Sequence, residues 1–164
     1  MRNRCVEARD QAQALEELVS RLLGADAAMA DGPSSPVAAC VLVVDDGADN
    51  RHLVSEVLEA EGIRTVLAAN GLEAVIAAHC LQLALVVMDL TMPVLDGIEA
   101  ARLMRASEAT RQVKVVAYTS APVAFEGVLG RYFDGVVVKP ADPAAMLSTV
   151  QRFLSDGTAS PGGR

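Results

Sequence analysis

The sequence contains very few aromatic residues and no tryptophan. Tyrosine and phenylalanine together make up only 3% of the 164 residues, so a hydrophobic core must be built from aliphatic side chains. Hydrophobic residues account for 52% of the chain and charged residues for 21%. This composition provides enough apolar material for one folded domain with short extensions.

Cysteines are also scarce, and their spacing is irregular. Cys5, Cys40 and Cys80 are an odd number with no CxxC pair, which argues against a disulfide framework or a structural zinc site. No apolar run is long enough to cross a bilayer, and no apolar stretch follows the basic residues 1–4 as it would in a secretory signal. The sequence therefore predicts a soluble, cytoplasmic protein that does not enter membranes.

Basic residues are outnumbered by acidic ones. The chain has 14 lysine and arginine residues against 21 aspartate and glutamate residues, which gives a formal net charge of −7. An acidic surface repels the phosphate backbone of DNA and RNA. We therefore expect no direct binding to nucleic acid.

The two ends of the chain differ in composition from the middle. Residues 1–24 are predicted to form an amphipathic helix, because leucine and valine recur at helical spacing between residues 15 and 23. Residues 25–39 are rich in Ala, Gly, Ser and Pro and predict a flexible linker, and residues 157–164 predict a disordered tail. The apolar stripe of the first helix could pack on its own domain, but we favour a homodimer or partner contact.

Short apolar runs alternate with helical segments over residues 40–156. The predicted strands are residues 41–44, 65–68, 83–88, 113–117 and 136–138. The predicted helices are residues 50–61, 72–81, 97–106, 123–131 and 143–154. Asp49 or Asn50 is expected to cap the first helix, and Gly62 to end it. Continuously apolar strands are typical of a parallel sheet covered by helices on both faces, so the sequence predicts an α/β, doubly wound domain.

Polar residues directly follow the apolar strands. Asp45 and Asp46 follow the first strand, Asp89 the third and Lys139 the fifth, and Thr119 ends the fourth. In doubly wound folds, ligands bind outside the carboxyl ends of the strands. A single Asp at such a place is more often a helix cap than a ligand. Four strand ends with compatible chemistry predict a functional site.

The chemistry of these groups favours phosphoryl transfer. Neighbouring strands lie about 4.8 Å apart, so adjacent first and third strands would bring three carboxylates together. Their mutual repulsion is relieved by a hard divalent cation, for which Mg²⁺ is the natural choice. Lys139 adds a positive charge and Thr119 a hydroxyl donor for a tetrahedral anion. These groups are sufficient for phosphoryl transfer to Asp89, which is therefore the predicted nucleophile.

The chain resembles the receiver domain of two-component response regulators, of the chemotaxis-regulator type. The segments that carry the resemblance are VLVVDD (41–46), VVMDLTMPVLDG (86–97), VVAYTS (115–120) and VVVKP (136–140). The resemblance covers about residues 40–156 and implies a flavodoxin-like three-layer sandwich with strand order 2-1-3-4-5. It also implies that a histidine kinase or a histidine phosphotransfer protein donates the phosphoryl group, and that a cis peptide bond precedes Pro140.

The resemblance assigns roles to individual residues. Asp89 would be the phospho-acceptor, and Thr119 and Lys139 would contact the phosphoryl group. The implied ligands of Mg²⁺ are Asp45, Asp46, Asp89 and the backbone carbonyl of Thr91. Such a domain is not an enzyme acting on other substrates, because it catalyses only its own phosphorylation and dephosphorylation.

One position departs from the family pattern. The usual activation switch has an aromatic residue three positions before the lysine, where this chain has Val136. The aromatic residues that could take its place are Tyr118, directly before Thr119, and Tyr132 and Phe133, shortly before Val136. The sequence does not identify which residue transmits activation.

The sequence is compatible with more than one function. The leading hypothesis is a single-domain response regulator or phosphorelay intermediate that acts through protein contacts or onward phosphotransfer, because only a short tail follows residue 154. A close variant is the receiver module of a hybrid histidine kinase. A non-phosphorylated pseudo-receiver typically lacks an acidic residue or the lysine, which are all present here. A hydrolase of the haloacid dehalogenase type needs a second Asp where this chain has Thr91.

Overall fold

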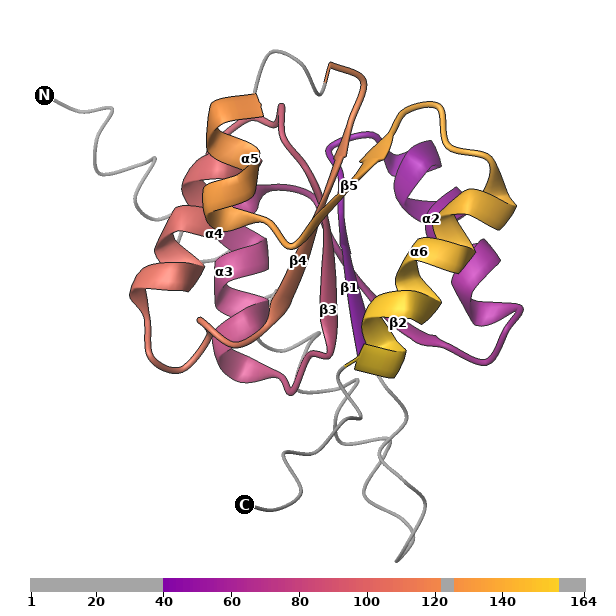
Figure 1. The fold of residues 1–164 in the computed structure, drawn as a ribbon, viewed down its shortest axis with the longest axis horizontal. Helices are drawn as coiled ribbons and strands as arrows, with labels where there is room; N and C mark the ends of the chain where they lie inside the picture. The colour runs from indigo at the N-terminus through magenta and orange to yellow at the C-terminus, as the bar shows by residue number, and fades with distance from the viewer. Residues whose placement is uncertain (1–39, 122–125, 157–164) are drawn as a thin grey trace, which may run out of the picture. The chain divides into compact units, whose positions relative to one another are not determined.

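The structure is a computed structural model that describes residues 40–121 and 126–156. The predicted N-terminal helix and linker, residues 1–39, and the predicted tail, residues 157–164, lie outside this part of the chain. The described residues form a five-stranded parallel sheet with strand order β2-β1-β3-β4-β5 (Figure 1). The predicted fold class and the strand order are thus confirmed.

The elements follow the predicted alternation of strand and helix. The strands are β1 (Cys40–Val44), β2 (Arg64–Ala68), β3 (Leu85–Asp89), β4 (Lys114–Thr119) and β5 (Gly135–Val138). The helices are α2 (Ala48–Glu59), α3 (Gly71–Cys80), α4 (Gly97–Ala106), α5 (Glu126–Tyr132) and α6 (Pro143–Asp156). Predicted and observed boundaries agree to within two residues, apart from the start of the helix predicted at 123–131. Residues 123–125 lie outside the described part of the chain.

Helices cover both faces of the sheet and make it the middle of three layers. Helices α3, α4 and α5 lie on one face, and α2 and α6 lie on the other (Figure 1). Every residue of β1 and of β3 is buried, because both strands are central in the sheet and covered on both sides. The continuous apolar runs in the sequence have this physical origin.

The start of α2 differs from the prediction. Gly47 is the N-cap residue and provides no side-chain cap, so the prediction that Asp49 or Asn50 caps this helix is wrong. The helix begins at Ala48, and in the short turn between β1 and α2 the Asp45 carboxylate accepts a hydrogen bond from the Gly47 amide at 2.8 Å. The end of α2 is as predicted, since Gly62 has a φ of 75° just beyond it.

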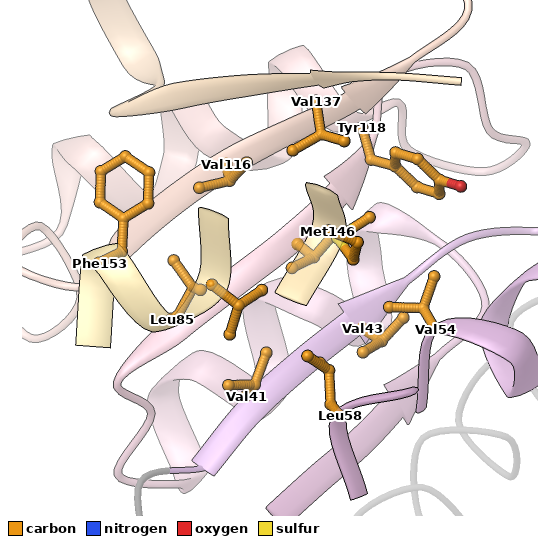
Figure 2. Close-up of a cluster of buried hydrophobic side chains, with 12 residues drawn as sticks. Val41, Val43, Val54, Leu58, Leu85, Val116, Tyr118, Val137, Met146 and Phe153 are labelled. Atoms are coloured by element: carbon orange, nitrogen blue, oxygen red, sulfur yellow. The ribbon is translucent and has the colours of Figure 1, made fainter. Parts of the chain in front are cut away.

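The core between the sheet and the α2–α6 layer is mainly aliphatic (Figure 2). Tyr118 and Phe153 are the only aromatic members of this cluster. The members of the cluster are Val41, Val43, Val54, Leu58, Leu85, Val87, Val116, Tyr118, Val137, Met146, Val150 and Phe153. The scarcity of aromatic residues is thus compensated by closely packed branched side chains.

Helix α6 shows how the helices attach to this core. Its buried residues are Met146, Val150 and Phe153, which recur every three or four positions and so lie on one face. It has 14 residues, and none of the described helices is long and apolar enough to span a bilayer.

Candidate functional site

Three carboxylates meet at one edge of the sheet. Strands β1 and β3 are hydrogen-bonded neighbours with Val44 opposite Met88, so Asp45 and Asp89 occupy corresponding places at their ends. Asp46 follows directly, and one oxygen from each of these three carboxylates lies within 4.8 Å of the others. The sheet topology therefore brings the three predicted acidic residues together.

Lys139 connects two of these carboxylates. Its side chain reaches back from the end of β5, and Nζ lies 2.7 Å from Asp45 Oδ2 and 3.2 Å from Asp89 Oδ2. Only 17% of the lysine side chain is exposed, so both contacts are partly shielded from water. The peptide bond between Lys139 and Pro140 is cis, as the resemblance implied.

The charges at this edge do not balance completely. Burial raises the pKa of Asp89 above its ordinary value, and the charge on Asp45 adds to this, while Lys139 and the Thr91 amide lower it by less. Burial alone would lower the pKa of Lys139, but the hydrogen bond to Asp45 and the two negative charges raise it. The lysine is thus well stabilised as a cation, whereas Asp89 is stabilised less well as an anion. A further positive charge beside Asp89 would correct this.

Asp45 and Asp46 differ in their freedom to move. Asp45 is only 2% exposed; its carboxylate accepts the Gly47 amide, and its backbone carbonyl accepts a hydrogen bond from Arg51. Asp46 is exposed to solvent. One carboxylate is therefore held in place and one can adjust, and a set of three carboxylates suits a hard cation such as Mg²⁺.

The two threonines lie at the same edge of the sheet. Thr119 ends β4 and is only 3% exposed, and its Oγ1 accepts a hydrogen bond from the Ala121 amide at 3.2 Å. The hydrogen of the Thr119 hydroxyl is then available for another acceptor. The Thr91 amide donates to Asp89 Oδ1 at 3.3 Å. That the Thr91 carbonyl binds a metal stays a prediction.

The loop between β3 and α4 is packed tightly against the backbone of Asp89. A Cβ atom on Gly97 would lie only 2.0 Å from the carbonyl oxygen of Asp89. A Cβ atom on Gly71, at the start of α3, would lie 2.4 Å from the carbonyl oxygen of Leu95. Neither of these close backbone contacts is predicted by the sequence pattern.

The same loop contains a tight turn at Val94. This residue has a φ of 69°, which is unusual for a β-branched side chain, and 73% of it is exposed. The Leu95 amide donates to the Pro93 carbonyl at 2.8 Å across the turn. The loop that follows Asp89 is thus held in one conformation at some cost in backbone strain.

Val136, which occupies the position of the family's aromatic switch residue, is not among the described residues that contact Lys139. Val136 is 40% exposed and Val138 is 50% exposed, on the side of β5 opposite the buried Val137. The aromatic ring that contacts Lys139 belongs to Tyr118 instead, with Nζ 4.7 Å from the ring centroid. The sequence does not predict this contact; the available signal is an aromatic residue directly before Thr119.

The sheet and its acidic edge correspond to a known protein family. The family model of the response regulator receiver domain matches residues 41–151, a range that contains all the predicted site residues. The chain belongs to this family. The receiver domain is a regulatory module of two-component signalling, so its place in a phosphorelay follows from the family.

Relatives of this receiver domain occur both alone and within larger proteins. Over 117 residues it is 34% identical to the CAI-1 autoinducer sensor kinase/phosphatase CqsS of Vibrio cholerae. This match covers 70% of this chain but only 17% of CqsS. Over 120 residues it is 28% identical to the polar-differentiation response regulator DivK of Brucella ovis, covering 71% of this chain and 96% of DivK. The chain thus spans about a sixth of CqsS but nearly all of DivK.

A solved structure supports the interpretation of the acidic edge. The receiver domain of the sensor histidine kinase PA1611 of Pseudomonas aeruginosa has a TM-score of 0.67 and 29% sequence identity. The match covers 73% of this chain and 99% of that one. In that structure a magnesium ion is coordinated in the active site cleft. The acidic cluster of this chain is chemically suited to the same kind of ion.

Proposed function

We propose that this receiver domain accepts a phosphoryl group on Asp89 from a phosphohistidine of a histidine kinase or a histidine phosphotransfer protein. The observation that carries the proposal is the meeting of three carboxylates within 4.8 Å, with Lys139 in contact with two of them. Mg²⁺ would be held by Asp45, Asp46, Asp89 and the carbonyl of Thr91. We place this exchange in the cytoplasm.

The transfer is an in-line displacement. A carboxylate oxygen of Asp89 forms a bond to phosphorus while the bond from phosphorus to the donor imidazole nitrogen breaks, and the imidazole keeps that electron pair. Lys139 neutralises charge on the phosphoryl oxygens, and the Thr119 hydroxyl donates a hydrogen bond to one of them. The cation, when bound, supplies further neutralisation of the oxygens of Asp89 and the phosphoryl group.

The output is expected through contacts with another protein or through onward phosphotransfer. A stand-alone regulator is supported by the near-complete coverage of DivK. A receiver module within a hybrid kinase is supported by the match to CqsS and by the likeness to the PA1611 receiver domain. A homodimer or partner contact through residues 1–24 stays a prediction, since these residues lie outside the described part of the chain.

Intact-mass spectrometry tests the acceptor directly. The protein is incubated with acetyl phosphate in the presence of Mg²⁺ or of a chelator, beside Asp89→Asn and a matched control, Asp96→Asn. Asp96 caps α4 by accepting the Glu99 amide at 2.8 Å, and asparagine is an equally good N-cap residue. A gain of about 80 Da that needs Mg²⁺ and is lost only in Asp89→Asn is expected.

Two other results would contradict the proposal in different ways. A wild-type protein that binds Mg²⁺ but gains no mass from acetyl phosphate or from a phosphorylated histidine phosphotransfer protein would be a pseudo-receiver. A protein that gains mass equally after Asp89→Asn would have its acceptor elsewhere.

A further inference from the structure

The ammonium group of Lys139 has an aromatic neighbour as well as two acidic ones. Its Nζ lies 4.7 Å from the centroid of the Tyr118 ring, in addition to its contacts with Asp45 and Asp89. A cation at this distance from a ring face is attracted by the negative charge of the π system. The contact is partly shielded from water, because Tyr118 is only 7% exposed and the lysine side chain 17%.

The Tyr118 ring is held by the core and not by a loop. Tyr118 lies in β4, opposite Asp89 on one neighbouring strand and Val137 on the other. Its side chain enters the cluster that contains Val54 and Met146, and Figure 2 shows it near these residues at one end of the cluster. The ring therefore offers Lys139 a fixed surface whatever the surrounding loops do.

The acidic partners of Lys139 have a second use in the proposed function. Its shortest contact, 2.7 Å, is to Asp45, which is also one of the expected ligands of the divalent cation. A cation bound to Asp45 competes with the lysine for that carboxylate. Hard divalent cations bind oxygen ligands and not the face of an aromatic ring. The contact between the Tyr118 ring and Lys139 is therefore not subject to this competition.

We propose that Tyr118 is a positioning residue for Lys139. When the divalent cation binds the Asp45 carboxylate, the Tyr118 ring keeps the Lys139 ammonium group beside Asp89. The inference rests on the proposed function for its role in phosphorylation.

Lysine NMR tests the contact itself. The chain contains only two lysines, Lys114 and Lys139, so selective ¹³C-lysine labelling gives two side-chain spin systems, and Lys114→Arg assigns them. Lys114 pairs with Asp134 at 3.7 Å and serves as the internal reference. An upfield ring-current shift of the Lys139 ε-protons is expected with and without saturating Mg²⁺. It should persist in Tyr118→Phe and vanish in Tyr118→Leu.

Phosphorylation kinetics test the consequence of the contact. At saturating Mg²⁺ and a fixed acetyl phosphate concentration, Tyr118→Leu should react about three- to tenfold more slowly, the effect of losing a partly shielded cation–π contact. Tyr118→Phe, which keeps the ring, should restore the rate. Tyr132→Leu removes the other tyrosine and controls for loss of a ring elsewhere. Urea unfolding of each variant separates any change in stability from the change in rate.

The outcomes distinguish the two proposals. Loss of the ring-current shift on addition of Mg²⁺, or a rate for Tyr118→Leu equal to that of wild type, would overturn the positioning role. If wild type is not phosphorylated at all but keeps the ring-current shift in Mg²⁺, the proposed function fails while the contact between Lys139 and Tyr118 stands.

Discussion

Gly97 begins α4, and its backbone lies directly against the main chain of Asp89. A Cβ atom at this position would lie 2.0 Å from the Asp89 carbonyl oxygen, 2.9 Å from its carbonyl carbon and 3.0 Å from the Leu90 Cα. All three are backbone atoms, so no side-chain rotation can relieve the overlap. The Gly97 amide also donates to the Leu90 carbonyl at 3.1 Å, and this bond fixes the same contact.

The size of the effect of Gly97→Ala follows from these distances. Ordinary van der Waals contact begins at 3.4 Å, so the Asp89 carbonyl and the new methyl group must separate by about 1.4 Å. Backbone shifts forced by overpacking typically cost about 1–3 kcal/mol, and an overlap with three backbone atoms belongs at the upper end of that range. The better helix propensity of alanine returns at most about 1 kcal/mol. We expect a net loss of at least about 2 kcal/mol from a domain whose total stability is of the order of 5–15 kcal/mol.

Urea unfolding of Gly97→Ala beside Gly130→Ala measures this difference. Gly130 lies in α5, where a Cβ atom would meet nothing within 4 Å, so its replacement should raise stability by about 0.5–1 kcal/mol. The Gly97→Ala protein should also be phosphorylated more slowly, because the displaced backbone is that of Asp89. If both alanine variants unfold at the same urea concentration, the close packing of Gly97 on Asp89 is refuted.

Three further predictions concern Val94 in the loop between β3 and α4, Arg105 in α4 and Asp89 at the end of β3. Val94→Asn should raise the free energy of unfolding by about 1 kcal/mol, because asparagine tolerates the φ of 69° better than valine; an unchanged urea midpoint would show that the turn is not strained. Arg105→Ala should lower the free energy of unfolding by about 2–3 kcal/mol, since the guanidinium donates to the Tyr132 carbonyl at 3.0 Å and to Asp134 Oδ2 at 2.7 Å. Arg105→Lys should recover only part of this loss in the same urea assay. Asp89→Asn should unfold at a higher urea concentration than wild type at neutral pH in chelating buffer. Burial raises the pKa of Asp89 in the folded state above its value in the unfolded state, so Asp89 lowers the stability of the wild type as the pH rises through these two pKa values. If the difference in urea midpoint between Asp89→Asn and wild type does not shrink when the pH is lowered, this account is wrong.

The fold and the position of the site were predictable because both depend on patterns that recur along the chain. Continuous apolar strands indicate a parallel sheet, and the carboxyl ends of parallel strands lie at one edge. Asp45 and Lys139 directly follow such strands and Asp89 ends one, so their meeting does not depend on the conformations of long loops. This is why residues that are 94 positions apart in sequence could be assigned to one site.

Other features depend on local geometry that a pattern does not specify. Helix α2 begins two residues earlier than predicted, with Gly47 as its N-cap, so Asp49 lies inside the first turn and cannot be the cap residue. The close contact of Gly97 with Asp89 arises from the path of the loop between β3 and α4, and glycine at a helix start has several explanations. The contact between Lys139 and Tyr118 requires the direction of a long side chain, which the sequence leaves open.

The charge distribution of the site links cation binding to the position of the lysine. Lys139 lies closer to Asp45, at 2.7 Å, than to Asp89, at 3.2 Å, so it interacts more strongly with Asp45. The pKa of Asp89 remains raised by burial despite the lysine. In the proposed function, a cation held by both carboxylates would compensate the charge of Asp89 and weaken the attraction between Asp45 and Lys139. The same binding event would thus stabilise Asp89 as an anion and make the ammonium group available to phosphoryl oxygens.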